Sequence, residues 1–166
     1  MKLKKNIIAL LAVAVVAGSV TVTRAGEEKE ETISLDKVPD AVHKALAAYA
    51  QDTEVKKAEV GDEDGKKVYE FDIEQGGKSF ELSFSKKGKF MGREEDIQLS
   101  DMPAATQTAL QGQAGDGKLS GFEKAEDKNH KITYEADIEK GGKKTEVAVD
   151  ENGKVISTED ASADKD

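Results

Sequence analysis

The chain has 166 residues with 34 acidic and 25 basic side chains, a formal net charge of −9, and it contains no Cys. The missing Cys excludes a disulfide framework, a catalytic thiol and a Cys-ligated zinc site. The acidic balance argues against nucleic-acid binding, which needs cations to replace the phosphate counterions.

The chain begins with the pattern of a secretory signal peptide. Lys2, Lys4 and Lys5 form a positive start, residues 7–17 are uninterruptedly apolar, and a small-x-small sequence ends at Ala25. This order predicts a signal peptide over residues 1–25 with cleavage after Ala25, and hence a periplasmic or secreted protein. An uncleaved anchor is the alternative, but the 16 residues from 7 to 22 are shorter than a membrane span prefers.

Cleavage would make the protein more acidic, because the leader holds four basic residues and no acid. The mature chain would keep 21 basic against 34 acidic side chains, a net charge of −13. No stable membrane insertion is expected after cleavage. Residues 26–32 and 161–166 are rich in charged and small residues, which predicts a disordered linker and a disordered tail.

The mature chain contains an internal repeat. Its segments recur in order at a spacing of 64 and then 65 residues, so the second copy has one extra residue before Tyr134. The matching segments are Ile33–Leu35 with Ile97–Leu99, Pro39 with Pro103, Tyr69–Glu74 with Tyr134–Glu139, Gly76–Lys78 with Gly141–Lys143, and Gly88–Lys89 with Gly153–Lys154. We therefore expect two repeats, over residues 33–95 and 96–160.

Each repeat is expected to form one helix followed by four strands. In the first, an apolar stripe at helical spacing runs from Val38 to Tyr49, and Pro39 suits a first helical turn. The second stripe is poorer, and Gly112, Gly115 and Gly117 predict an early end for that helix.

The later segments of both repeats alternate between apolar and polar residues. Tyr69, Phe71 and Ile73 would face a core, and Gly76-Gly77 would form the hairpin turn. The predicted class is α+β, with two tandem units that each pack a helix on a four-stranded antiparallel sheet. Units of about 64 residues bury small cores, so the two should pack together.

Several short motifs fail the tests of their chemistry. Gly77-Lys78-Ser79 lacks the earlier Gly of a phosphate-binding loop, since Asp72 stands there. Asp62–Gly65 and Asp150–Gly153 lack an oxygen ligand at the first position of a calcium loop, so we interpret them as turns. His43 and His130 have no second His at metal spacing. We therefore predict no cofactor, no metal site and no enzymatic activity.

The alternation places a set of acids on the outward face of the predicted sheets. These acids keep their positions in both repeats while apolar residues change, as Phe71 does against Ala136. A solvated face is one interpretation, and a docking surface for a cationic partner or a weak cation site is the other. The candidate residues are Glu70, Asp72, Glu74, Glu81, Glu135, Asp137, Glu139 and Glu146.

The signal peptide, the tandem Ile-x-Leu-x-x-x-Pro segments, the Tyr-Glu-x-Asp-Ile-Glu strands and the Gly-Gly-Lys hairpins resemble the exported PepSY-like family, also described as β-lactamase-inhibitor-like. The resemblance covers about residues 33–160. It implies helices on one face of a four-stranded antiparallel sheet, repeated in tandem, and an extracytoplasmic binding or inhibitory module without a cofactor. No functional residues follow from it, because the matching positions belong to cores and turns.

Two functions remain open from the sequence. The first is an exported, non-catalytic binding module, inhibitor-like in one version, that presents a sheet surface to a protein or envelope partner. The alternative is an envelope protein that binds cations such as calcium on its acidic face.

Overall fold

The computed structural model describes residues 30–51, 53–63 and 65–161. Within them, nine strands and two α-helices follow one another along the chain. The strands are β1 (Glu31–Thr32), β2 (Glu54–Glu63), β3 (Lys66–Gln75), β4 (Lys78–Ser85), β5 (Phe90–Asp96), β6 (Lys118–Asp127), β7 (Ile132–Lys140), β8 (Lys143–Val149) and β9 (Val155–Asp160), and the helices are α1 (Asp40–Tyr49) and α2 (Ala104–Ala114).

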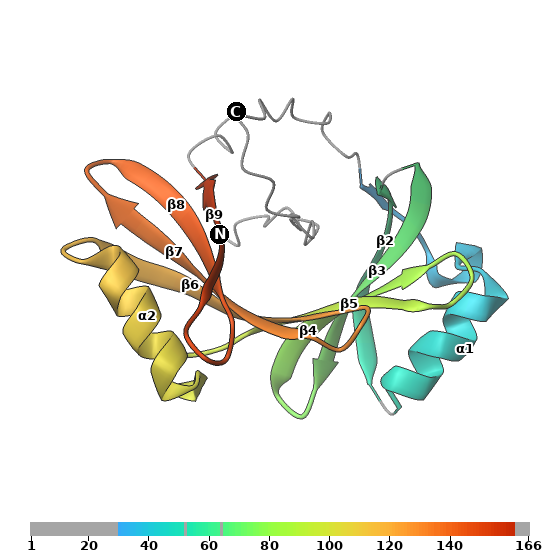
Figure 1. The fold of residues 1–166 in the computed structure, drawn as a ribbon. Coiled ribbons are helices and arrows are strands. Elements are labelled where there is room, and N and C mark those ends of the chain that lie inside the picture. The colour runs from blue at the N-terminus through green and yellow to red at the C-terminus, as the bar shows by residue number, and fades with distance from the viewer. Residues whose placement is uncertain (1–29, 52, 64, 162–166) are drawn as a thin grey trace.

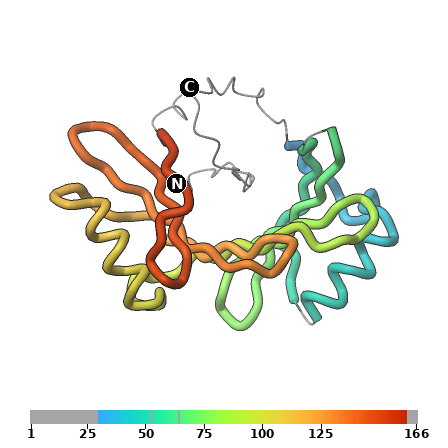
Figure 2. The backbone as a smooth tube through the Cα atoms, viewed as in Figure 1, coloured from blue at the N-terminus to red at the C-terminus, as the bar shows by residue number. Residues whose placement is uncertain are grey.

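All nine strands belong to a single antiparallel sheet in the order β1 to β9. The sheet is bent into an open U, with α1 and α2 on its convex side (Figure 1). In the backbone trace the two arms of the U meet at its base, where β5 of one arm pairs with β6 of the other (Figure 2). We call α1 with β2–β5 the first half and α2 with β6–β9 the second half.

The predicted fold class is therefore wrong. We expected an α+β protein with two separate four-stranded sheets, whereas β5 pairs with β6 from Gly92 opposite Asp127 to Asp96 opposite Glu123 and joins both halves into one mostly β structure. This pairing satisfies the backbone of two strands that would otherwise be exposed edges. Alternation in the sequence shows which way side chains point, but it does not show which strands are edges.

Each half has its own apolar core between the helix and the sheet. In the first, Phe71 and Phe84 are almost fully buried beneath Val42 of α1. In the second, Ala136 takes the place of Phe71, and Leu110 of α2 is fully buried over Val147 and Val149. The alternation of the strands supplies these residues to the convex side of the sheet only.

The two helices differ from expectation in detail. Pro39 and Pro103 immediately precede them, where proline costs no helical hydrogen bond. Gly112 does not shorten α2, which continues to Ala114 and ends at Gly115 with a φ of 58°. Tyr49, expected on the buried stripe, is 48% exposed and stacks on Phe90 with ring centroids 4.9 Å apart.

The extra residue of the second copy lies in the turn between β6 and β7. Glu59 pairs with Glu70 across β2 and β3, and Glu123 pairs with Glu135 across β6 and β7, so the second hairpin is one residue longer. His130 in this turn has a φ of 61° and stacks on Phe90 with centroids 5.5 Å apart. The longer turn thus contacts the first half.

Three predicted segments lie wholly or mostly outside the described residues. The signal peptide over residues 1–25 lies wholly outside them, as do residues 26–29 of the linker and 162–166 of the tail. Glu31–Thr32 lies within the linker that we predicted to be disordered over residues 26–32, but it forms β1, which pairs with β2.

Candidate functional site: two rows of glutamates on the concave face

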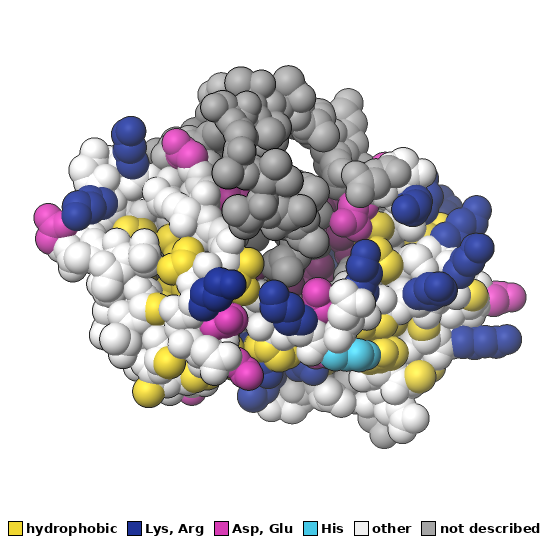
Figure 3. Space-filling model, in the orientation of Figure 1, with side chains coloured by type: hydrophobic (Ala, Val, Ile, Leu, Met, Phe, Trp, Pro, Cys, Tyr) yellow, Lys and Arg dark blue, Asp and Glu magenta, His cyan; other side chains and the backbone are white. Residues whose placement is uncertain are grey.

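The concave face of the sheet consists of the strand residues that point away from the helices. On β3, Tyr69, Phe71 and Ile73 enter the core, so Glu70 and Asp72 face the inside of the U. The same alternation places Glu135 and Asp137 of β7 on this side. Figure 3 shows acidic side chains beside the opening of the U, and lysine and arginine side chains both at the margins and over the middle of the visible face.

Four glutamates cross the first half, one on each strand. Glu59 of β2 lies directly opposite Glu70 of β3, and Glu81 of β4 lies directly opposite Glu94 of β5. Glu70 and Glu81 are diagonal neighbours, because Asp72 is the residue opposite Glu81. We call Glu59, Glu70, Glu81 and Glu94 the first glutamate row.

The second half repeats this arrangement strand by strand. Glu123 of β6 lies opposite Glu135 of β7, and Glu146 of β8 lies opposite Glu159 of β9. Asp137 is opposite Glu146, as Asp72 is opposite Glu81. We call Glu123, Glu135, Glu146 and Glu159 the second glutamate row. Because β5 and β6 are neighbours, the two rows form one acidic band across eight strands.

Burial changes the acidity of the first row. Glu70 is 9% exposed, and its burial together with the nearby Glu30 and Glu59 carboxylates raises its pKa to about 8. Burial and the neighbouring Glu70 and Glu94 raise the pKa of Glu81 to about 9. Both shifts arise because a low-dielectric surrounding and like charges disfavour the ionised carboxylate. At the end of the row, the Lys57 Nζ lies 2.5 Å from the Glu59 Oε2.

The second row shows the same shifts. Burial and the carboxylates of Glu146 and Glu94 raise the pKa of Glu135 to about 8. The pKa of Glu146 is also raised, by burial and by Asp137 and Glu123, although Lys144 opposes this shift. Lys144 lies 3.0 Å from Asp137. Glu70, Glu81 and Glu135 therefore hold protons at neutral pH that exposed carboxyl groups would release.

Glu70 also has an unused hydrogen-bonding atom. Its Oε2 is buried and has no hydrogen-bond partner among the described residues. A buried carboxylate oxygen without a donor destabilises the fold, because it has lost water without gaining a replacement. Thr133, on the same face of β7 as Glu135, has a buried hydroxyl in the same condition.

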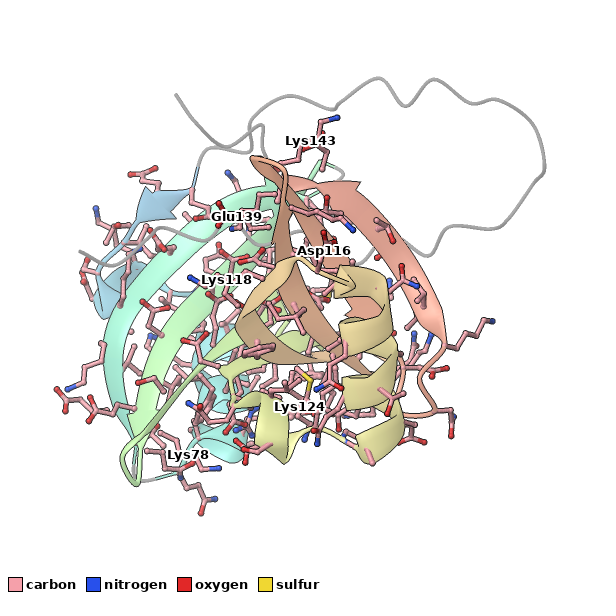
Figure 4. All side chains as sticks on the ribbon, turned by 90° about the vertical axis from the view of Figure 1, so that its left-hand side faces the viewer. Lys78, Asp116, Lys118, Lys124, Glu139 and Lys143 are labelled. Carbon is pink, nitrogen blue, oxygen red and sulfur yellow. The ribbon has the colours of Figure 1, made fainter. Side chains whose placement is uncertain are left out.

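Two of the predicted residues lie apart from the others, at the ends of their strands. Glu74 is opposite Glu54 and lies 3.1 Å from Lys56. Glu139 is opposite Lys118, and Figure 4 shows both at the end of the second half that also carries Asp116. Glu74 thus has a lysine partner and Glu139 lies opposite a lysine, so neither belongs to the rows.

The sequence thus indicated part of the site. Glu70, Glu81, Glu135 and Glu146 stand at the centres of the rows, and Asp72 and Asp137 lie beside them. Four row members were missed: Glu59, Glu94, Glu123 and Glu159. The match of Glu94 with Glu159 in the repeat was a signal for two of them. Glu59 and Glu123 lie on the two strands whose alternation is weakest in the sequence, and a bulge in each interrupts the register.

Within the described ranges, no set of three His, Cys, Asp or Glu side chains is arranged to hold a metal ion. His43 instead contacts the Leu35 carbonyl oxygen at 2.7 Å, and His130 contacts Glu126 at 2.5 Å. Neither helix of the described part is long and apolar enough to cross a membrane.

The comparisons with known proteins agree with this architecture. Residues 25–92 match the family described as "Putative beta-lactamase-inhibitor-like, PepSY-like". The predicted resemblance to the PepSY-like family is confirmed for the first repeat, which this match covers. No curated protein matches the sequence.

Solved structures with the same fold come from Bacteroides species. A BLIP-like protein from Bacteroides fragilis is 19% identical, with a TM-score of 0.64 over 77% of this chain and 90% of that chain. A DUF2874 family protein from Bacteroides uniformis is 13% identical, with a TM-score of 0.66 over 76% and 92%. A structure described as "putative periplasmic proteins" from Bacteroides eggerthii is 16% identical, with a TM-score of 0.62 over 74% and 88%. At these identities the likeness concerns the fold alone.

Proposed function

We propose that this PepSY-like protein is an exported, non-catalytic binding module whose concave face docks a cationic surface of a partner protein. The observation that carries this proposal is the pair of matched glutamate rows. Directly opposed like charges on neighbouring strands destabilise a sheet. The glutamate rows nevertheless contain two such Glu–Glu pairs in each half, in the same places.

Charge complementarity selects the partner. The band across eight strands is acidic and concave, so it suits a convex surface that carries lysine or arginine side chains. A cationic partner would favour the ionised form of these carboxyl groups, which burial and neighbouring acids disfavour in the free protein. A hydrolase is one such partner, which the inhibitor-like description of the family supports.

Export is supported by the sequence and by one structural neighbour. Residues 1–25 have the order of a signal peptide. The Bacteroides eggerthii structure with the same fold is described as "putative periplasmic proteins". Both observations support a location of the mature protein in the periplasm or outside the cell.

Calcium binding is the second candidate function. It is favoured by the buried Oε2 of Glu70, which would suit a hard cation. The described carboxylates are not gathered into a metal site, however, so calcium would have to draw side chains from different strands together. Docking of a protein requires no such rearrangement.

The proposal is tested by capture of envelope proteins on the immobilised mature chain at low salt. We expect wild-type protein to retain a basic protein that is released at about 0.5 M salt, because exposed charges are then screened. A variant with Glu81→Gln and Glu135→Gln should lose it. Glu151→Gln, in the exposed turn after β8, is the matched control and should keep it.

Equal retention of the basic protein by the row variant and by the control variant would contradict docking on the concave face. Calorimetry with calcium chloride separates the second candidate. Measurable heat and a raised melting temperature would support calcium binding, since a ligand of the folded state stabilises it.

A further inference from the structure

Two buried polar atoms have no hydrogen-bond partner among the described side chains, and both belong to the concave face. They are the Glu70 Oε2 on β3 and the Thr133 Oγ1 on β7. Glu70 is 9% exposed and Thr133 is 1% exposed. Each atom is costly for the free protein, because it has lost water without gaining a replacement. A ligand that supplies hydrogen bonds at both places would remove this cost.

A line of small residues joins these two atoms across the sheet. Ser83 of β4 lies opposite Glu70 on one side and opposite Gly92 of β5 on the other. Ala125 of β6 lies opposite Thr133 and is a diagonal neighbour of Gly92. Residues directly opposite each other share a face of the sheet, so the line follows the concave face. We call Glu70, Ser83, Gly92, Ala125 and Thr133 the transverse line.

The short side chains within the line leave the sheet open to close approach. A glycine inside a strand often marks a place where another backbone or a ligand comes near. Ser83, Gly92 and Ala125 are the three members between the two unsatisfied atoms, and none has a side chain longer than two heavy atoms. An extended ligand can therefore contact the backbone of β4, β5 and β6 between its two polar contacts.

The fold does not require the Thr133 hydroxyl. Thr133 directly precedes Tyr134, as Val68 precedes Tyr69 in the first half, so the repeat places Val68 at the equivalent position. Val68 is 6% exposed there, and it has nearly the shape of threonine without a polar atom. The hydroxyl is thus a departure from the repeat at a place where a methyl group would pack.

The length of the transverse line selects the size of the ligand. Neighbouring strands lie about 4.8 Å apart, so the steps from β3 through β4, β5 and β6 to β7 span about 19 Å. A metal ion or a single amino acid cannot contact both ends. An extended polypeptide rises about 3.3 Å per residue, so about six residues cover this distance.

The residues beside the line select the charge of the ligand. The same strands carry glutamates two residues away, along one side of the line: Glu81, Glu94, Glu123 and Glu135. Lysine or arginine side chains would complement this border. The backbone of a polypeptide also carries N–H donors for the Glu70 Oε2, and donors and acceptors for the Thr133 hydroxyl.

We propose that the transverse line binds an extended, basic polypeptide segment of the partner protein, which crosses the strands and hydrogen-bonds through its backbone to Glu70 and Thr133. This inference rests on the proposed function, because it states which part of a cationic partner the concave face recognises. A loop or a terminal segment of the partner supplies such a chain.

The test is titration calorimetry of the mature chain at pH 7 and low salt with two decapeptides. One peptide alternates alanine and lysine. The other has the same sequence with N-methyl groups on its alanine nitrogens, which removes N–H donors and keeps the charge. We expect the unmodified peptide to bind at least fivefold more tightly, and equal affinities would overturn recognition of the backbone.

Variants locate the segment on the sheet. Thr133→Val removes the unsatisfied hydroxyl, so it should raise the melting temperature of the free chain and weaken the unmodified peptide at least threefold. A purely structural hydroxyl would change the melting temperature alone. Thr158→Val, exposed on the other face of β9, is the matched control and should leave the affinity unchanged.

A second variant tests the middle of the line. Ser83→Val places a larger, branched side chain between the two polar contacts, in a strand that favours such residues. It should weaken the unmodified peptide at least fivefold, and its melting temperature shows that it is folded. Unchanged affinity in both Thr133→Val and Ser83→Val would overturn the transverse line as the binding site.

The outcomes also separate this inference from the proposed function. If the immobilised chain captures a basic envelope protein but neither decapeptide binds, the segment is wrong while docking of a cationic surface stands. If no basic protein is captured and neither decapeptide binds, both are wrong.

Discussion

Glu81 on β4 and Glu94 on β5 lie directly opposite each other on the concave face, and Glu146 and Glu159 repeat this relationship on β8 and β9. Such a pair is unfavourable while both carboxylates are ionised. The raised pKa of Glu81, about 9, shows how the folded chain accommodates it, since the protein retains a proton there.

Stability should therefore fall as the pH rises. The pKa values of Glu70, Glu81 and Glu135 lie at about 8, 9 and 8, above their ordinary value of 4.5. Between pH 4.5 and about pH 9, the folded chain therefore binds more protons than the unfolded chain. The stabilisation is complete below pH 4.5 and is lost as the pH rises towards 9. Thermal unfolding of the mature chain should show a melting temperature that decreases from pH 5 to pH 9. A constant or rising melting temperature would contradict the protonated rows.

Glu81→Gln should remove part of this dependence. Glutamine is neutral at every pH, so it resembles the protonated carboxyl and cannot develop the unfavourable charge. We expect the variant to be more stable than the wild type at pH 9 by about 1 kcal/mol or more, and nearly equal to it at pH 5. Denaturant unfolding at the two pH values measures the difference. Glu151→Gln is the control, and the same gain in that variant would show that overall charge, rather than the row, is responsible.

How much of this arrangement the sequence could reveal depends on the interaction concerned. Alternation along one strand predicts that Tyr69 and Glu70 point to opposite faces of the sheet, and the repeat predicts the same for Tyr134 and Glu135. The pairing of β5 with β6 could not be derived, because Arg93 opposite Glu126 is a contact between distant segments with no local signature.

The helices show the same limit. The apolar stripe of α2 is weak in the sequence, yet Thr106 is fully buried there because its hydroxyl donates to the Asp150 carbonyl oxygen at 2.9 Å. Its counterpart in α1 is the fully buried Val42. A polar residue on a core stripe can be interpreted only when its partner is known, and the partner lies 44 residues away.

Two turn glycines should respond very differently to alanine. Gly76, in the turn between β3 and β4, has a φ of 59° and open space around its α-carbon. Gly88, in the turn between β4 and β5, has a φ of 72°, and a Cβ there would lie 2.8 Å from the Ala41 carbonyl carbon of α1. Gly76→Ala should cost about 1 kcal/mol, from the left-handed backbone alone. Gly88→Ala should cost about 3 kcal/mol or more, because the helix must also move.

Denaturant unfolding of the two variants compares these costs. Gly153→Ala provides a matched test in the second half, since a Cβ at Gly153 would lie 2.7 Å from the Ala105 carbonyl oxygen. It should behave like Gly88→Ala. Similar small losses in all three variants would show that the turns and the helices are not packed as closely as described.

Binding of a cation to the concave face should release protons. Glu70 of β3 lies opposite Glu59 of β2, and Glu81 and Glu94 continue the row. Lys57 pairs with Glu59 at the end of the row, and the carboxylates of Glu30 and Glu63 lie near Glu70. A bound cationic group favours the ionised carboxylates and lowers their raised pKa values, so protons leave as the ligand enters. Affinity for a short lysine-containing peptide should therefore rise between pH 6 and pH 9, because fewer protons must be displaced at higher pH. Titrations at pH 7 in buffers of different ionisation enthalpy count the protons released, and Glu81→Gln should reduce that number. Proton uptake, or affinity that does not change with pH, would contradict binding at the protonated rows.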